Sequence, residues 1–328
     1  MKRILAVLLV LVFAVLPLSG CGSKQTIKTG FAVITSVAKS ADAGENDGLA
    51  QADSVIVAVL VDSNGKIIDC VIDQAQSKVN FNNSGEVVTP LDAVFRTKNE
   101  LGTEYGMGRV SGIGKEWNEQ AAAFAKYVTG KTVDQVKNIA VSNGYPTSSD
   151  LTSSVTMHVT ELIEGVEKAV ANAKDLGAAK GDKLSVATVT SIAKSTNATA
   201  TAPGLAQIYS TYVAMTQDKS GKITSAIFDA SQSNINFDQN GKITTDLSIA
   251  PRTKNELKEA YGMGRVSSIG KEWYEQAASF ADYIKGKTVA QVKGIAIDQS
   301  GTPTGSDLTS SVTIHVTDFI TLVEKAAK

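Results

Sequence analysis

The sequence predicts an α+β protein with two tandem homologous domains, each an antiparallel sheet of hairpins packed with helices, after an N-terminal signal peptide. Three observations predict this: an apolar N-terminal run, a long internal repeat, and hairpin patterns followed by helical patterns in each copy. The chain has 328 residues, of which 43% are hydrophobic, and a net charge of −1. Its length suits two domains with cores of their own. Its charge argues against nucleic acid as a partner, because phosphate binding needs a clustered basic excess.

The N-terminus has the pattern of a secretory leader. Two basic residues precede the apolar run 4–18, which is short for a membrane span but suits a signal peptide. The run ends in a Leu-Ser-Gly-Cys sequence that resembles a bacterial lipobox, in which the cysteine, here Cys21, is acylated and becomes the new N-terminus. We therefore expect a lipoprotein signal peptide at 1–20, a tether at 21–30, and anchorage to the extracellular face of the cell membrane. The alternative is a plain secretory signal with a chance cysteine.

An internal repeat divides the rest of the chain. Residues 96–140 align without gaps with residues 252–296, and 34 of the 45 pairs are identical. A period of about 150 residues corresponds to a whole domain rather than a solenoid unit. The segment 173–183 is rich in Ala, Gly and Lys and predicts the boundary. We expect the two domains to span 31–175 and 183–328.

Each copy begins with strand patterns. The apolar runs 54–61 and 66–73 flank the turn sequence 62–65, which predicts a β-hairpin. A second turn sequence at 82–85 predicts further strands.

Helical patterns follow. One apolar face with steps of four, four, three and four is formed by Ile113, Trp117, Ala121, Phe124 and Val128. A capping-box pattern at 132–135, repeated at 288–291, predicts a short helix. A C-terminal amphipathic helix is predicted from Val155, Val159, Leu162, Ile163, Val166 and Ala169.

Some residues could carry chemistry but have simpler interpretations. Trp117 and Trp273 could form a flavin or sugar platform, although their helical spacing favours the core. Glu116 and Glu119 lie three apart on a helix, and we expect them on its solvent side rather than as a catalytic pair.

The segment 105–109 recurs unchanged as 261–265. Its glycines would let a backbone approach a ligand, with Arg109 and Arg265 as candidate phosphate partners, or it is a tight loop between strands and helices. No ligand lies at zinc spacing from the lone His of each copy, so we expect no metal site.

The most informative segment is 149–156, which recurs unchanged as 306–313 although the residues before it have diverged. Its Asp and small hydroxyl residues predict the start of the C-terminal helix. A helix N-terminus suits a phosphate, and Thr156 offers a hydroxyl there. For a single copy, capping would be a sufficient explanation.

This segment resembles the flavinylation motif of FMN-binding domains, Asp-x-x-Ser/Thr-Gly/Ser-Ala-Ser/Thr. In that family a flavin transferase takes FMN from FAD and joins its phosphate to the last Ser or Thr. The matching positions are Asp150, Ser153, Ser154 and Thr156 in the first copy and Asp307, Ser310, Ser311 and Thr313 in the second. Val155 and Val312 stand where the family has Ala.

The resemblance implies an extracellular electron carrier with two covalent FMN groups per chain, on Thr156 and Thr313. It also implies a flavin transferase for maturation, a membrane electron donor, an extracellular electron acceptor and contact with the lipid bilayer through Cys21. No catalytic side chain is expected. The first alternative is a surface lipoprotein that acts as a binding or structural module without flavin, which Val155 and Val312 favour. A second is a surface hydrolase, which would need a nucleophile and a base that the sequence does not show.

Overall fold

The computed structural model describes residues 26–328, so the predicted signal peptide and Cys21 lie outside the described residues. Two antiparallel three-stranded sheets share one topology, in which neighbours in sequence are neighbours in the sheet. The first contains β1 (Lys28–Ser36), β2 (Gly48–Val61) and β3 (Ile67–Phe81), and the second contains β6 (Lys183–Ser191), β7 (Gly204–Gln217) and β8 (Ile223–Phe237). The predicted α+β class with two similar halves is confirmed.

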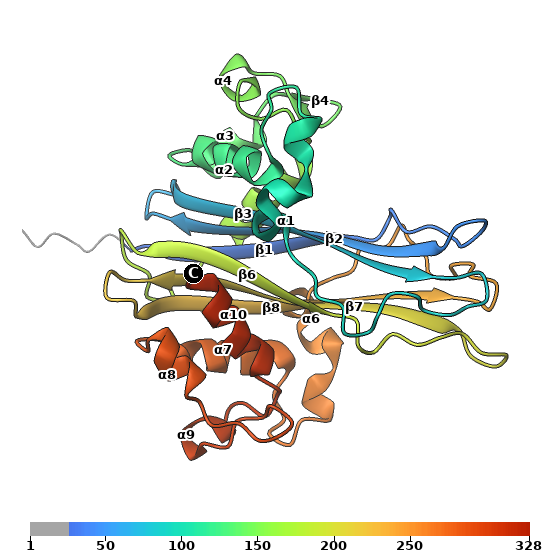
Figure 1. Ribbon diagram of the computed structural model, residues 1–328. Coiled ribbons are helices and arrows are strands. Elements are labelled where there is room, and N and C mark those ends of the chain that lie inside the picture. Colours follow the sequence, from blue (N-terminus) through green and yellow to red (C-terminus); the bar gives the residue numbers. More distant parts are fainter. Residues whose placement is uncertain (1–25) are drawn as a thin grey trace, which may run out of the picture.

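Helices cover the outer face of each sheet, so that the order through the molecule is helices, sheet, sheet, helices (Figure 1). The first half has α1 (Lys98–Leu101), η1 (Gly102–Tyr105), η2 (Met107–Arg109), α2 (Trp117–Val128), α3 (Val133–Lys137), α4 (Ser149–Thr152) and α5 (Thr160–Ala171), with the two-residue strands β4 (Val141–Ser142) and β5 (Tyr145–Pro146). The second half has α6 (Lys254–Leu257), η3 (Lys258–Tyr261), η4 (Met263–Arg265), α7 (Trp273–Ile284), α8 (Val289–Lys293), α9 (Ser306–Thr309) and α10 (Thr317–Ala326). None of the helices within 26–328 is long and apolar enough to span a bilayer.

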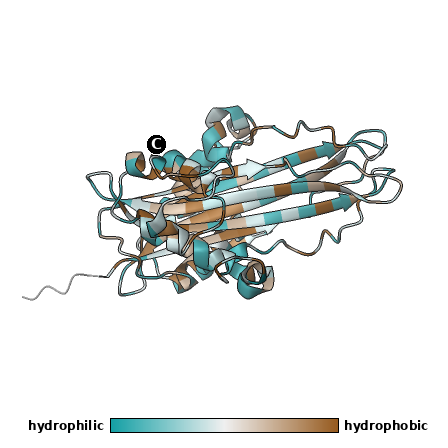
Figure 2. Cartoon of the chain, turned by 90° about the horizontal axis from the view of Figure 1, so that it is seen from below, coloured by the Kyte–Doolittle hydropathy of each residue, from teal (hydrophilic) through white to brown (hydrophobic). Residues whose placement is uncertain are grey.

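The central strands are buried on both faces. In β2 the side chains of Val55, Val57 and Val59 join the core under the helices of their own half. The alternate residues Ile56 and Ala58 join a core shared with the second sheet. Successive residues of a strand point to opposite faces, so the unbroken apolar run of β2 reflects two covered faces. Figure 2 shows apolar positions gathered along the strands and hydrophilic residues on the connecting loops.

The two sheets pack face to face through residues from both halves. The rings of Phe81 and Phe237 stack with centroids 4.2 Å apart and planes inclined by 7°. The Tyr212 hydroxyl donates to the Ser54 hydroxyl at 3.0 Å across the same interface. Phe81 and Phe237 occupy equivalent positions in the repeat, so the sandwich has an approximate two-fold axis near this stack.

Equivalent residues connect the halves in both directions. The backbone amide of Ala43 donates to the carbonyl of Gly241 at 2.8 Å, and that of Ala198 donates to the carbonyl of Gly85 at 2.7 Å. Two equivalent ion pairs also cross between the halves: Lys168 with Glu256, and Lys325 with Glu100. This reciprocity is that of an isologous dimer interface built within one chain.

The folded part begins earlier than the sequence predicts. Ile27 is buried between the sheets and β1 starts at Lys28, so the end of the expected tether 21–30 belongs to the sandwich. Sequence patterns missed β1 because its apolar residues are interrupted by Thr and Gly. The expected boundary segment 173–183 lies between α5 and β6.

The turn at 82–85 is present, since the Asn82 side chain accepts hydrogen bonds from the Ser84 and Glu86 amides. The prediction of further strands after it is wrong in this region. The following segment crosses to the other half, where the Val87 amide donates to the Asn197 side chain at 2.9 Å. Its backbone groups therefore pair outside any sheet, apart from an isolated bridge to Phe81.

The helix α2 begins at Trp117 rather than at the predicted Ile113. Its N-cap is Glu116, whose amide donates to the Glu119 carboxylate at 2.8 Å. The expected solvent position is wrong for Glu116, because this capping role holds it in a buried place. The predicted capping box at Thr132 is confirmed at the start of α3.

Candidate functional site

The repeated motif does not open the C-terminal helix as the sequence predicted. Its first residues form the separate turn α4, and α5 starts only at Thr160. Between them Val155, Met157 and Val159 are buried while Thr156 is half-exposed, which is the alternation of an extended segment. The helix N-terminus is therefore not the feature that positions Thr156, and the same arrangement recurs in the second half.

A buried glutamine positions the motif threonine in each half. The Thr156 amide donates to Gln120 Oε1 at 2.8 Å, and the Thr313 amide donates to Gln276 Oε1 at 2.8 Å. The Thr313 hydroxyl donates to the same oxygen at 3.2 Å. Gln276 Nε2 in turn donates to the Ser267 hydroxyl at 3.1 Å and to a backbone carbonyl at 2.9 Å. These acceptors fix the orientation of the amide, so its oxygen faces the threonine.

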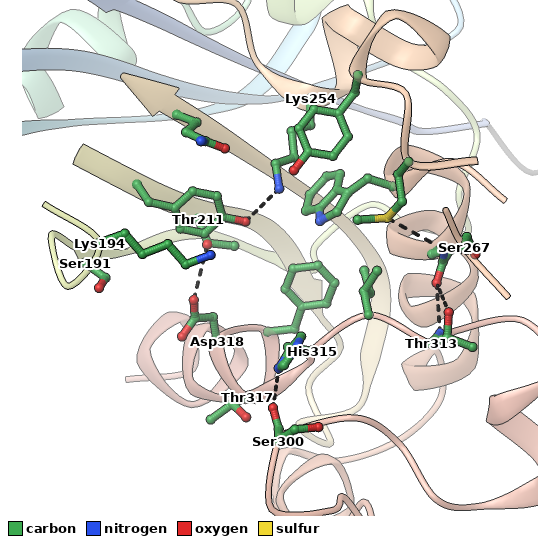
Figure 3. Close-up of a pocket in the computed structure, with 18 of the residues that line it drawn as sticks. Ser191, Lys194, Thr211, Lys254, Ser267, Ser300, Thr313, His315, Thr317 and Asp318 are labelled. Carbon is green, nitrogen blue, oxygen red and sulfur yellow. Dashed lines mark hydrogen bonds between the residues drawn. The ribbon is translucent and has the colours of Figure 1, made fainter. Parts of the chain in front are cut away.

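Thr313 borders a cavity of about 840 Å³ on the outer face of the second sheet (Figure 3). The walls come from β7 and β8, from the η3 and η4 turns, from the start of α7 and from the segment that leads into α10. Aromatic side chains line much of it: Tyr209, Tyr261, Trp273 and Phe319. The volume falls in the range of small-molecule and cofactor sites, which is roughly 300–1,000 Å³.

A buried lysine lies among these rings. Lys254 Nζ is 4.7 Å from the ring centroid of Tyr209, 4.4 Å from that of Tyr261 and 4.9 Å from that of Trp273. It also donates to the Tyr209 hydroxyl at 2.9 Å. Burial lowers the pKa of Lys254 to about 7, because the charged form loses its hydration. The aromatic faces partly offset that loss.

The first half repeats this arrangement around Lys98. Its Nζ lies 4.6 Å from the Tyr105 centroid and 5.1 Å from the Trp117 centroid. Burial lowers the pKa of Lys98 to about 8. Thr156 and Gln120 take the places of Thr313 and Gln276, so each half presents a threonine hydroxyl and a buried lysine on one outer face.

Of the motif positions predicted in the second copy, Thr313 lines the cavity and the others lie in the turn before it. Asp307 is exposed and accepts a hydrogen bond from the Tyr283 hydroxyl at 2.9 Å. The Ser311 hydroxyl donates to a backbone carbonyl within the turn at 3.1 Å, and Ser310 is exposed. The first copy places Asp150, Ser153 and Ser154 in the same way, with the Ser154 hydroxyl 3.2 Å from its carbonyl acceptor.

The valines that depart from the family motif point into the protein. Val155 and Val312 are both fully buried and belong to the main core of their halves. Their bulk is therefore absorbed by core packing rather than placed over the half-exposed threonine that follows each of them.

The remaining sequence candidates divide between core, surface and cavity wall. Trp117 and Trp273 are in the core as expected, and Trp273 also lines the cavity. Arg265 is exposed and lies outside the cavity wall. Both histidines are exposed: His315 lines the cavity and contacts the Ser300 carbonyl through Nδ1, and its counterpart His158 packs on a tyrosine ring.

Sequence reasoning missed the buried lysine and the buried glutamine. Lys98 and Lys254 follow a capping threonine in an identical Arg-Thr-Lys-Asn-Glu-Leu segment of the repeat, and charged residues there are ordinarily expected at the surface. Their identity in both copies was the available signal. Within the described residues, no group of three or more His, Cys, Asp or Glu side chains could hold a metal ion.

Comparison with curated proteins gives a short match. A 41-residue stretch is 51% identical to part of the chlorophenol reductase of Desulfitobacterium hafniense, and the stretch covers 12% of each chain. No family model matches the chain, and no solved structure matches it. The chain therefore covers about an eighth of the length of that curated relative.

Proposed function

We propose that the chain is a membrane-anchored extracellular electron carrier that holds FMN covalently on Thr156 and Thr313. The observation that carries this proposal is the place of Thr313 on the wall of an aromatic cavity with a buried lysine. A flavin acceptor needs a neighbouring space that can take the cofactor, whereas a segment that only caps a helix needs no such space. The short match to a protein named a reductase agrees with a redox role.

The residues of the cavity fit a flat, aromatic, anionic group. Tyr261, Trp273 and Phe319 would pack against a planar ring system. Lys194, and Lys254 in its protonated form, would supply positive charge, and Thr313 would hold the phosphate. When bound, FMN supplies the electron-transfer chemistry, while the protein supplies attachment, burial and charge.

Gln276 would prepare the acceptor for attachment. It accepts from the Thr313 hydroxyl, so that proton points to the amide and the oxygen lone pairs are left for the phosphorus. In the attachment step the Thr313 oxygen forms a bond to the FMN phosphorus of FAD, and the pyrophosphate bond to AMP breaks. The hydroxyl proton leaves to a base of the transferase, and AMP is released.

Intact mass of the purified protein tests the proposal. After expression with a flavin transferase, we expect two FMN additions, each less one water. Thr156→Val and Thr313→Val should each lose one addition, whereas Thr152→Ala, a change at an unspecified position of the motif, should keep both. An unmodified mass from the native host would contradict covalent attachment.

The same experiment decides the alternative of a surface lipoprotein that binds or supports other molecules without flavin. In the sequence, the departure of Val155 and Val312 from the family motif favours that alternative, whereas the burial of both side chains in the core removes their bulk from the threonines. Its expected result is an unmodified mass together with retained folding.

A signal peptide and acylated Cys21 are part of the proposal, with the lipid bilayer, an electron donor in the membrane and an extracellular acceptor as partners. Cys21→Ser should release the protein from the membrane fraction.

A further inference from the structure

The two sites differ in one charged residue. Of the 22 residues that line the C-terminal cavity, 15 have identical counterparts in the first copy. Among the seven differences, only Asp53 in place of Tyr209 changes the formal charge. The two positions are equivalent in the sheets: Asp53 pairs with Ser36, and Tyr209 pairs with Ser191.

Asp53 is buried close to Lys98 and Tyr105, which correspond to Lys254 and Tyr261 of the C-terminal cavity. Asp53 is 6% exposed, and its carboxylate accepts hydrogen bonds from Lys39 Nζ at 2.8 Å and from Gln51 Nε2 at 2.8 Å. At the equivalent place in the other half, the neutral Tyr209 hydroxyl accepts from Lys254.

Asp53 gives the N-terminal site one formal negative charge that the C-terminal site lacks. It raises the pKa of Lys98 against the larger lowering effect of burial. Buried charges interact more strongly than charges in water, so a group that gains electrons at this site is opposed by Asp53. Glu161 and Asp318 are equivalent acids of the two sites and cancel in the comparison.

We propose that the two sites have unequal reduction potentials, and that Asp53 makes the N-terminal site the more reducing one. The proposal rests on the proposed function for the identity of the redox group. The order of the two potentials follows from the presence of Asp53 in one site and Tyr209 at the equivalent position of the other. Electron transfer from one site to the other needs no further reactant, because the electron that the group on Thr156 loses is the electron that the group on Thr313 gains.

Proteins loaded at a single site measure the difference. The full chain with Thr313→Val carries FMN at Thr156 alone, and the chain with Thr156→Val carries it at Thr313 alone. In a spectroelectrochemical titration we expect the first to have the lower potential. A tenfold bias in the exchange corresponds to about 59 mV for one electron. Equal potentials, or the reverse order, would overturn the inference.

Exchanging the charge assigns the effect to position 53. Asp53→Asn should raise the potential at Thr156 and leave that at Thr313 unchanged. Tyr209→Asp should lower the potential at Thr313 even if Asp53→Asn disturbs folding. Tyr209→Phe is the matched control, because it removes the hydroxyl without adding a charge, and we expect a smaller shift from it than from Tyr209→Asp.

A measurement on the flavin-free protein separates this inference from the proposed function. In an NMR titration of labelled lysines, Asp53→Asn should lower the pKa of Lys98 and leave that of Lys254 unchanged. An unchanged Lys98 would overturn the electrostatic argument. Absence of FMN from both threonines would overturn the proposed function and the difference in potentials with it. Equal potentials on two loaded threonines would overturn this inference alone.

Discussion

The buried amide of Gln276 joins three segments of the chain at one point. It accepts from Thr313 and donates to Ser267 and to the Lys271 carbonyl, so its removal leaves several buried groups without partners. An unsatisfied buried polar group costs about 1–3 kcal/mol. Thr313 is thus held by the same contacts that stabilise its half.

Replacement of Gln276 by Met should lower the free energy of unfolding by roughly 2–4 kcal/mol, because the volume is kept and the hydrogen bonds are lost. Urea denaturation measures it. Ser279→Ala on the same helix is the control, since the first copy already has Ala123 there, and a change within about 0.5 kcal/mol is expected. An equally small effect of Gln276→Met would contradict the structural role of the amide.

The carboxyl of Asp229 should make stability depend on pH. Burial raises its pKa to about 7, so between about pH 4 and pH 7 the folded state binds a proton that the unfolded state has lost. The contribution of this carboxyl to the free energy of unfolding is therefore complete below pH 4 and is lost as pH rises through 7. Asp229→Asn should be close to the parent at pH 4 and more stable than it by roughly 2–4 kcal/mol at pH 8.

Unfolding free energies from pH 4 to 8 measure this dependence. Asp73→Asn is the counterpart in the first half, and its effect should be complete at lower pH, because burial raises the pKa of Asp73 only to about 6. If the unfolding free energies of the parent and Asp229→Asn changed in parallel from pH 4 to 8, the raised pKa of Asp229 would be contradicted.

At the scale of elements, the start of β7 depends on a close approach to a ring. A Cβ added at Gly204 would lie 2.2 Å from a carbon of Phe237, the ring that stacks on Phe81. Gly204→Ala should therefore displace the stack and lower stability by about 1–3 kcal/mol. Gly44→Ala is the control, because an added Cβ meets nothing within 4 Å there. Chemical denaturation of both variants checks the difference.

Sequence patterns predicted the elements whose signals are local. The hairpin of β2 and β3, the helix at Trp117 and the capping box at Thr132 rest on periodicity and turn chemistry within a few residues. The strand β1 was missed because Thr and Gly interrupt its apolar residues. The start of the motif helix was predicted too early, because Val155, Met157 and Val159 alternate in an extended segment before it.

Features of the site that depend on the whole fold could not be predicted in this way. The sequence singles out Thr313, but the cavity beside it brings together Tyr209, Lys254 and Trp273 from three distant segments. Nothing in the local pattern around Lys254 marks it as buried. The contact between the halves was equally invisible, since an apolar strand does not say which surface covers it.

At the scale of the whole molecule, the two halves share their inner cores. Two clusters of buried residues draw members from both sheets, and equivalent ion pairs cross in both directions. We expect one calorimetric unfolding transition, because neither half can keep its inner face covered alone. Phe237→Ala should lower the temperature of that transition without splitting it, with a loss of about 3–5 kcal/mol. Two separate transitions in the parent protein would contradict this cooperativity.

The stack of Phe81 on Phe237 also bears on how the duplicated halves could diverge. A substitution on an inner face meets the other copy at once, so the two inner surfaces are bound to change together. Substitutions on the outer faces meet only their own half. In a protein that arose by duplication and has this architecture, the two outer surfaces can specialise independently. The surface between the halves can change only through substitutions that both copies accommodate.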